Sequence, residues 1–164
     1  VSGEEFSFNQ TVGEQTAERG FKEAAGILNG KVVPAYGGGI CQVSSTLYMA
    51  VLYANLEVTE RGNHDLVSSY VPAGLDAAVA WGDLDFRFIN NREYPVRIDA
   101  WYEGDDLTVE IWGTETDDTY VEMETEIVSG VNDDMLLVDT YRKVFDGDGS
   151  QLYVQKEGES AYMR

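Results

Sequence analysis

The chain of 164 residues is 43% hydrophobic and carries a formal net charge of −19 at pH 7. This length is enough to bury a substantial core in one domain, and so negative a charge argues against nucleic acid or anionic lipid surfaces as partners. No run of about 18 apolar residues occurs, so no membrane span is predicted, and the opening at Val1-Ser2-Gly3 is typical of a domain excised from a longer protein.

Residues 14–36 contain signals for both helix and strand. Apolar side chains recur at helical spacing, but Gly20 and Gly26 interrupt the pattern. Asn29-Gly30 is a strong hairpin signal, because both central positions of a type I′ turn need a positive φ. We therefore predict a short helix or turn around 14–20, followed by a hairpin through Asn29-Gly30.

A helix is predicted next, within residues 40–55, with Cys41 in its first turn. This segment is apolar on more than one face, which is typical of a helix in the middle of a domain. The residues of its main apolar stripe are Ile40, Val43, Leu47, Ala50, Val51 and Ala54.

Beyond residue 65 the apolar pattern changes to the alternation of strands, and short turns between the strands imply antiparallel pairing. The predicted class is α+β, with one buried helix starting at Cys41 and packed on an antiparallel sheet. An N-terminal hairpin and a C-terminal β-hairpin extension complete the prediction. The predicted strands are 66–72, 76–81, 84–90, 95–102, 106–112, 119–128, 135–144 and 151–156.

Cys41 is the only cysteine of the chain, and it follows the run Gly37-Gly38-Gly39-Ile40. A packed cysteine needs no such run of small residues, whereas a nucleophile does, because a substrate carbonyl must come within bonding distance of the sulfur. Backbone amides at a helix start also stabilise a thiolate and the oxyanion that its attack creates. The pattern predicts a nucleophile; the alternative is a small packed residue.

His64, the only histidine, is the predicted general base for Cys41. The helix runs out, the chain turns near Leu56-Glu57, and the following segment returns toward the helix start. The alternative is a surface histidine in an Asn-His-Asp turn. Asp76 and Asp85 are both candidates for the carboxylate that orients the imidazole, and Asp76 is slightly favoured.

The remaining candidates are substrate-binding residues around the cysteine. Gln42 and Ser44 follow Cys41, and each is assigned either to substrate contact or to capping of the first helical turn. Tyr70 is either a core residue or a wall of the substrate cleft. Gly38 and Gly39 provide the close approach for a substrate.

No metal and no cofactor are predicted. One His and one Cys make a zinc site improbable, and the glycine run lacks the Lys-Ser/Thr of a phosphate-binding loop. Asp146–Ser150 resembles the start of a calcium loop, but Gln151 replaces the required glycine, so a hairpin turn is predicted. The acidic stretch 98–141 contains no Lys or Arg and is predicted to be a solvated sheet face, with attraction of cations as the alternative.

The segment GGGICQVSSTLY at 37–48 resembles the VanW-like domain family. The resemblance covers most of residues 5–115 and places a catalytic domain at 1–127, with 128–164 as a strand and hairpin extension of the same domain. Further matching segments are Phe6-Ser7-Phe8-Asn9, Val12-Gly13, Glu60-Arg61, His64, Tyr70-Val71-Pro72, Gly74, Asp76-Ala77, 85–91, 140–146 and Asp148-Gly149.

The resemblance implies an exported protein of a Gram-positive bacterium, located at the cell wall or the outer face of the cytoplasmic membrane. Family members are often membrane-anchored, so an anchor is expected upstream, with no membrane contact by this segment. Some members are L,D-transpeptidases, which implies that Cys41 attacks peptidoglycan stem peptides and that His64 acts as base and then acid. The alternatives are a cysteine peptidase or carboxypeptidase on wall peptides and a non-enzymatic wall-binding module. The sequence gives no indication of the oligomeric state.

Overall fold

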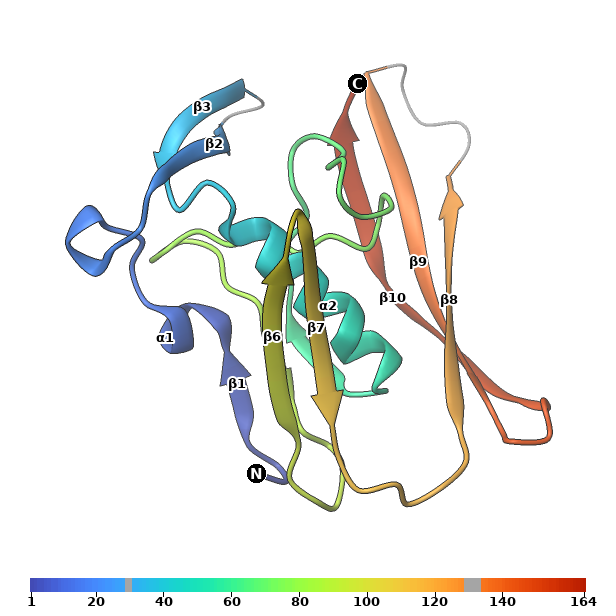
Figure 1. The fold of residues 1–164 in the computed structure, drawn as a ribbon. Helices are drawn as coiled ribbons and strands as arrows, with labels where there is room; N and C mark the ends of the chain where they lie inside the picture. The colour runs from blue at the N-terminus through green and yellow to red at the C-terminus, as the bar shows by residue number, and fades with distance from the viewer. Residues whose placement is uncertain (29–30, 129–133) are drawn as a thin grey trace.

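The computed structural model describes residues 1–28, 31–128 and 134–164. Within these ranges one long helix lies behind a β-hairpin and beside a three-stranded sheet (Figure 1). In chain order the elements are β1 (Glu5–Ser7), α1 (Phe8–Val12), the 3-10 turn η1 (Ala17–Arg19), β2 (Glu23–Leu28), β3 (Lys31–Tyr36), α2 (Ile40–Tyr53), β4 (Glu57–Glu60), β5 (Arg87–Ile89), β6 (Arg97–Glu103), β7 (Asp106–Trp112), β8 (Tyr120–Ile127), β9 (Met135–Phe145) and β10 (Gln151–Met163).

The described strands form four small antiparallel sheets rather than the single sheet that the sequence predicts. Their orders are β1-β5-β4, β10-β9-β8, β2-β3 and β6-β7. The α+β class is correct, because one long helix packs against antiparallel strands. The predicted N-terminal hairpin forms between β2 and β3, whose register pairs Leu28 with Lys31, while its turn residues 29–30 lie outside the described residues.

Helix α2 begins at Ile40, one residue before the predicted start, and its end reverses the chain. Asn55 has a φ of 54°, and the amides of Asn55 and Leu56 donate to the carbonyls of Leu52 and Val51. This is a Schellman motif with asparagine in the left-handed position that glycine most often occupies. Because of this reversal, β4 leads the chain back along α2.

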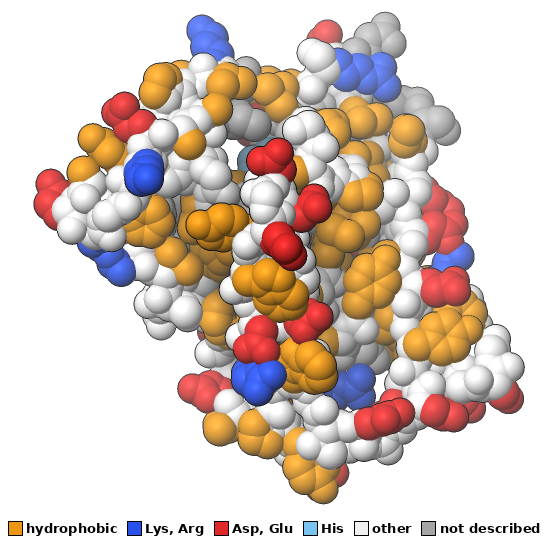
Figure 2. Space-filling model, in the orientation of Figure 1, with side chains coloured by type: hydrophobic (Ala, Val, Ile, Leu, Met, Phe, Trp, Pro, Cys, Tyr) orange, Lys and Arg blue, Asp and Glu red, His pale blue; other side chains and the backbone are white. Residues whose placement is uncertain are grey.

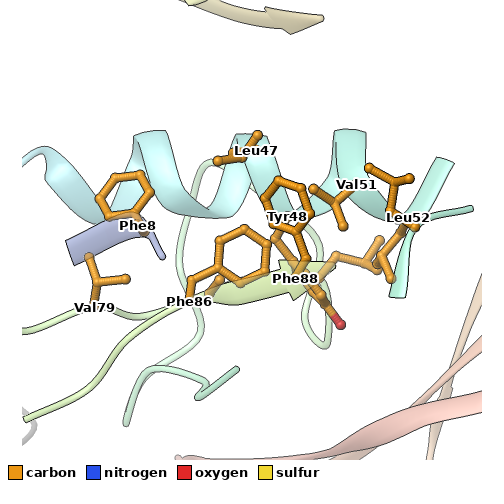
Figure 3. Close-up of a cluster of buried hydrophobic side chains, with 11 residues drawn as sticks. Phe8, Leu47, Tyr48, Val51, Leu52, Val79, Phe86 and Phe88 are labelled. Carbon is orange, nitrogen blue, oxygen red and sulfur yellow. The ribbon is translucent and has the colours of Figure 1, made fainter. Parts of the chain in front are cut away.

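The core lies where α2 meets the β1-β5-β4 sheet and the loop that precedes β5 (Figure 3). Three aromatic side chains are in contact within it, since Phe86 meets Tyr48 edge-on and lies tilted against Phe88. The buried residues of this core are Phe8, Leu47, Tyr48, Val51, Leu52, Leu56, Leu75, Ala77, Val79, Phe86 and Phe88.

Two predicted strands, 66–72 and 76–81, are loops in the structure, apart from isolated bridges at Ala78 and Ala80. In the second segment, side chains bond to the backbone of Asp76 and Ala77; for example, the carbonyl of Asp76 accepts from the guanidinium of Arg61. The predicted strand 84–90 shortens to β5, and β10 extends to Met163, beyond its predicted end at 156. The sequence reading missed β1, α1 and β4.

In the described parts of the acidic stretch, 98–128 and 134–141, the acidic residues are exposed or partly exposed, in agreement with the predicted solvated face. Figure 2 shows carboxylates alternating with hydrophobic side chains over the β6–β7 hairpin. The predicted turn at Asp146–Ser150 joins β9 to β10. Within the described part of the chain, no helix has the length and hydrophobicity needed to cross a bilayer.

Candidate active site

Cys41 occupies the first turn of α2 and is partly exposed. The preceding glycines allow a close approach of chains, because a Cβ atom on Gly38 would lie 2.5 Å from the carbonyl oxygen of Ala24 in β2. The Cys41 sulfur lies 3.5 Å from both the backbone nitrogen and the carbonyl oxygen of Val79. The nitrogen of Val79 therefore donates to the sulfur from the loop beside the helix.

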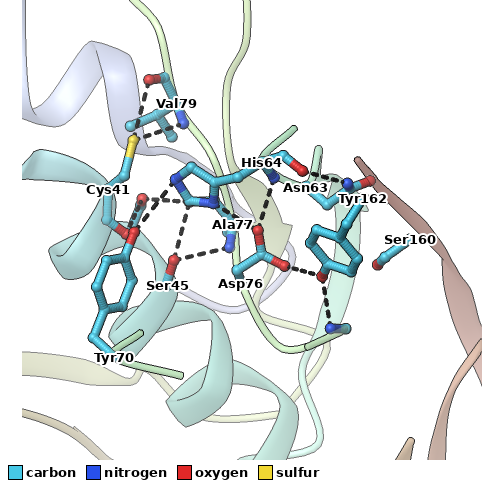
Figure 4. Close-up of polar contacts among 12 residues, drawn as sticks. Cys41, Ser45, Asn63, His64, Tyr70, Asp76, Ala77, Val79, Ser160 and Tyr162 are labelled. Atoms are coloured by element: carbon cyan, nitrogen blue, oxygen red, sulfur yellow. Dashed lines mark hydrogen bonds and ion pairs between the residues drawn. The ribbon is translucent and has the colours of Figure 1, made fainter. Parts of the chain in front are cut away.

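His64 lies beside Cys41, on the segment that follows β4 (Figure 4). Its Nδ1 is 2.6 Å from Oδ2 of Asp76, and its backbone nitrogen donates to the same oxygen at 2.7 Å. An ionised carboxylate only accepts hydrogen bonds, so the proton on this contact belongs to Nδ1. The other ring nitrogen, Nε2, is left for chemistry at the sulfur.

Asp76 is completely buried and its carboxylate accepts four hydrogen bonds. Besides the two from His64, Oδ1 accepts from Nη2 of Arg61 at 2.9 Å and from the hydroxyl of Tyr162 at 2.5 Å. Burial alone would raise the pKa of Asp76, but the bonds from His64 and Tyr162 and the charge of Arg61 outweigh it and lower the pKa. Asp76 is thus a fixed negative charge behind the imidazole.

The protonation of His64 follows from its two neighbours. Burial lowers the pKa of His64, but hydrogen bonds to Asp76 and Cys41, with the charges of those groups, outweigh burial and raise it to about 9. The imidazole is therefore protonated at neutral pH. A cationic imidazole beside a sulfur is an arrangement that activates cysteine nucleophiles.

Tyr70 lies at the edge of this group, with 39% of its surface exposed. Its hydroxyl is 3.3 Å from Nε2 of His64, and the two rings meet edge-on. Burial of the phenol and the nearby charge of Cys41 raise the pKa of Tyr70 to about 12, so the hydroxyl keeps its proton. Tyr70 thus has a polar group at the imidazole and a ring facing solvent.

Ser44, for which either substrate contact or capping of the first helical turn is predicted, faces the loop that carries Asp76. It is fully buried and donates to the carbonyl of Ala77 at 2.6 Å. Ser45 accepts from the amide of Ala77 at 3.0 Å, so both serines hold the loop that carries Asp76. Two buried serine hydroxyls of α2 thus make hydrogen bonds to the backbone of Ala77 that a neighbouring strand would otherwise make.

The other predicted substrate-binding residues near the helix start differ in their exposure. Gly39 is exposed, and a Cβ atom there would meet nothing within 4 Å. Gln42 is half-buried, and its backbone N–H donates to the carbonyl of Gly39. Gly38 is packed against β2, and its lack of a side chain allows the helix start to lie close to that strand.

Asp85, the second candidate for orienting His64, lies among other partners. It accepts from the hydroxyl of Ser7 at 2.5 Å, from the amide of Asn9 at 2.9 Å and from Nε of Arg87 at 2.9 Å. These contacts join β1 and α1 to β5. The geometry therefore places Asp76, and not Asp85, against the imidazole.

Three further residues of the site escaped the sequence analysis as candidates: Arg61, Ser160 and Tyr162. Arg61 donates to Asp76, and its Nη1 also donates to Ser160 at 2.7 Å. No local pattern marks Ser160 or Tyr162, because they lie more than 80 residues along the chain from Asp76. Among the described residues, no cluster of three or more His, Cys, Asp or Glu side chains has the arrangement of a metal site.

Comparison with known proteins identifies the family. Residues 1–112 match the family described as VanW like protein, and the chain belongs to that family. It is 44% identical over 112 residues to the uncharacterized protein YoaR of Bacillus subtilis strain 168. It is also 29% identical over 109 residues to the vancomycin B-type resistance protein VanW of Enterococcus faecalis strain V583.

These alignments cover part of each protein. They span 68% of this chain and 37% of YoaR, and 63% of this chain and 39% of VanW. No solved structure matches the chain significantly. All of Cys41, His64 and Asp76 lie within the family match, whereas Ser160 and Tyr162 lie beyond its end at residue 112.

Proposed function

We propose that this protein is a cysteine acyltransferase that cross-links peptidoglycan stem peptides as an L,D-transpeptidase. The observation that carries the proposal is the sequence of contacts from Asp76 to His64 to Cys41, at the start of a helix approached by glycines. Nucleophile, base and orienting carboxylate in this order are the parts of a catalytic triad. The VanW name of one relative, a vancomycin resistance protein, supports a substrate in the cell wall.

The first half-reaction forms an acyl-enzyme. The thiolate of Cys41 attacks the carbonyl carbon that precedes the terminal D-alanine of a tetrapeptide stem, and a carbon–sulfur bond forms. The protonated His64 gives its Nε2 proton to the departing amine as the carbon–nitrogen bond breaks. D-alanine leaves, and the imidazole is left neutral between Asp76 and the thioester.

The second half-reaction transfers the acyl group. An amine of a second stem attacks the thioester carbonyl, neutral His64 accepts the proton that the amine loses, and the carbon–sulfur bond breaks. The new amide is the cross-link, and Cys41 returns as thiolate beside the imidazolium. Asp76 remains ionised throughout and keeps the Nδ1 proton in place, so that Nε2 alone exchanges protons.

Substrate binding is assigned to the residues around the sulfur. The exposed backbone at Gly39 and the partly buried Gln42 flank Cys41 in the sequence at the helix start. The half-exposed ring of Tyr70 forms a wall next to His64. The site requires no cofactor, and its location is the outer face of the cytoplasmic membrane or the wall itself.

Incubation with a disaccharide-tetrapeptide, followed by mass spectrometry of the products, separates the possible functions. A transpeptidase releases D-alanine and forms cross-linked dimers when a second stem supplies the amine. A cysteine carboxypeptidase, the alternative with the same residues, forms tripeptide with or without the acceptor. A wall-binding module forms neither product but pulls down with purified peptidoglycan. Product formation that persists in Cys41→Ala would refute both enzyme assignments.

A carbapenem provides a second probe of the thiolate. Opening of the lactam ring by Cys41 adds the full mass of the drug to the protein, and peptide mapping locates the adduct. Cys41→Ala is expected to remain unmodified, and His64→Gln to react far more slowly. An adduct on any other residue would contradict the assignment of Cys41 as the nucleophile.

A further inference from the structure

The C-terminal strand β10 meets the two loops that carry His64 and Asp76. Asn63, the residue before His64, donates to the carbonyl of Ala161 at 2.7 Å. The amide of Met163 donates to the carbonyl of Asp65, the residue after His64, at 2.7 Å. Both neighbours of the histidine are thus bonded to one strand, which fixes the backbone of His64 from the C-terminal end of the chain.

Tyr162 extends from the same strand to the carboxylate, and its hydrogen-bond direction is determined. The backbone N–H of Gly74 can only donate, so it donates to the Tyr162 hydroxyl at 2.6 Å. The hydroxyl proton is therefore free for Oδ1 of Asp76, 2.5 Å away. Tyr162 is completely buried, so water does not compete for this proton.

The loop that carries Asp76 is also held by the neighbouring strand β9. Gly74 has a φ of +88°, and a Cβ atom there would lie 2.5 Å from Oγ1 of Thr140. The same Thr140 hydroxyl donates to the carbonyl of Gly74 at 2.9 Å. Thr140 and Tyr162 thus bind the carbonyl and the amide of one glycine, two residues before Asp76.

We propose that β10 is a positioning element of the active site, in which Tyr162 directly and Ser160 through Arg61 hold the Asp76 carboxylate against His64. The inference rests on the proposed function for its effect on turnover. It extends the site beyond the family match at 1–112 to residues that touch neither substrate nor sulfur. Tyr162 and Ser160 are accordingly positioning residues.

The test is Tyr162→Phe, which keeps the buried ring and removes only the hydroxyl. The single histidine of the chain gives one imidazole signal, so its NMR titration reports the pKa of His64 directly. A carboxylate released by the loss of Tyr162 turns away from the imidazole, and the pKa of His64 falls from about 9 toward its ordinary 6.5. With substrate, kcat falls about tenfold and KM changes little, because a hydrogen bond to a charged group is lost behind the catalytic atoms.

Tyr153→Phe is the matched control. Tyr153 lies on the same strand, and its hydroxyl contacts Asn55 at the far end of α2. This variant is expected to leave the pKa of His64 and kcat unchanged. If the carboxylate stayed in place without the Tyr162 hydrogen bond, its charge would be less neutralised and would raise the pKa of His64. An unchanged or higher pKa of His64 in Tyr162→Phe therefore overturns the inference.

Two further results keep the test decisive. If Tyr162→Phe does not fold, Ser160→Ala takes its place, because it removes the hydroxyl that accepts from Nη1 of Arg61. This variant is expected to lower the pKa of His64 by a smaller amount, and an unchanged pKa would then overturn the inference. The titration needs no substrate. A lowered pKa in a protein whose wild type forms no product would therefore refute the proposed transpeptidase and leave the positioning role standing.

Discussion

Asp76 and Asp85 are two buried aspartates with lowered pKa values, and only one of them meets an imidazole. In both cases burial raises the pKa and a set of hydrogen bonds outweighs it. The donors to Asp76 include the ring of His64, whereas those to Asp85 are Ser7, backbone amides and Arg87. Burial and a lowered pKa are therefore common to both aspartates, and only the hydrogen-bond partners distinguish the proposed catalytic carboxylate from the structural one.

The two aspartates also differ in the elements of the fold that surround them. Asp85 accepts from the amide of Asn9 in α1 and from the side chain of Arg87 in β5, so its role is to attach the N-terminal segment. Asp76 lies on a loop that makes only isolated bridges and is held by side chains from α2 and β10. The side chains that hold this loop thereby place the Asp76 carboxylate beside His64.

Asparagine substitutions should separate the two aspartates most strongly. Asp76→Asn removes the charge and allows the amide to donate to Nδ1, which leaves the wrong ring nitrogen protonated; we expect kcat to fall on the order of 10³–10⁴-fold. Asp85→Asn should keep the rate per folded molecule. Dimer formation from stem peptides measures both, and comparable losses in the two variants would remove the distinction.

Asp85→Asn should lower the stability of the protein even though it keeps the rate. Its carboxylate accepts from the side chain of Arg87 and from the Ser7 hydroxyl, and losing one bond to a charged acceptor costs about 2 kcal/mol. For a chain of this size, Tm should fall by about 5 °C. Calorimetry of Asp85→Asn measures the shift, and an unchanged Tm would show that Asp85 does not anchor the N-terminal segment.

The pH dependence of stability should also distinguish the sites. Both aspartates lose stabilisation as pH falls below their ordinary pKa of 3.8, so acid does not separate them. His64 keeps its proton up to about pH 9 when folded but only to about 6.5 when unfolded, so its contribution is complete below 6.5 and is lost as pH rises to 9. Between these values Tm should fall more in the wild type than in His64→Gln. Parallel Tm curves would contradict the raised pKa.

A pair of hydroxyl deletions gives the smallest expected effect. Tyr70→Phe removes the hydroxyl that accepts from Nε2 of the protonated His64 and should lower kcat roughly fivefold, without a large change in Tm. Ser7→Ala, on the Asp85 side, should lower Tm and leave kcat unchanged. Kinetics and melting curves of the two variants check the pair, and a rate loss in Ser7→Ala would mean that the two regions are coupled.

The sequence was sufficient to predict the elements that depend on local pattern. The helix that carries Cys41, the β2–β3 hairpin and the strands near 97–112 follow from apolar spacing and turn residues. The strands predicted at 66–72 and 76–81 were wrong, since both segments are loops. At Asp76 and Ala77, serines of α2 and the guanidinium of Arg61 bond to the backbone in place of a neighbouring strand. Alternation alone does not distinguish a strand from a loop held by side chains.

The sequence indicated the central residues of the candidate site, but not the residues that support them from distant parts of the chain. Single copies of Cys and His, with a glycine run and a chain reversal between them, indicated Cys41 and His64. The reversal made at Asn55 brings them together as expected. The choice of Asp76 over Asp85 and the contribution of Tyr162 depend on tertiary packing, which no spacing in the sequence encodes.

Intact-mass analysis of the acyl-enzyme tests the central claim most directly. The wild-type protein is mixed with a stem tetrapeptide without acceptor amine, quenched in acid within the first turnover, and compared with Cys41→Ala. The account predicts a gain equal to the tripeptide acyl group on Cys41, one D-alanine released per protein, and no gain in the variant. Release of D-alanine at an equal rate by Cys41→Ala would contradict it.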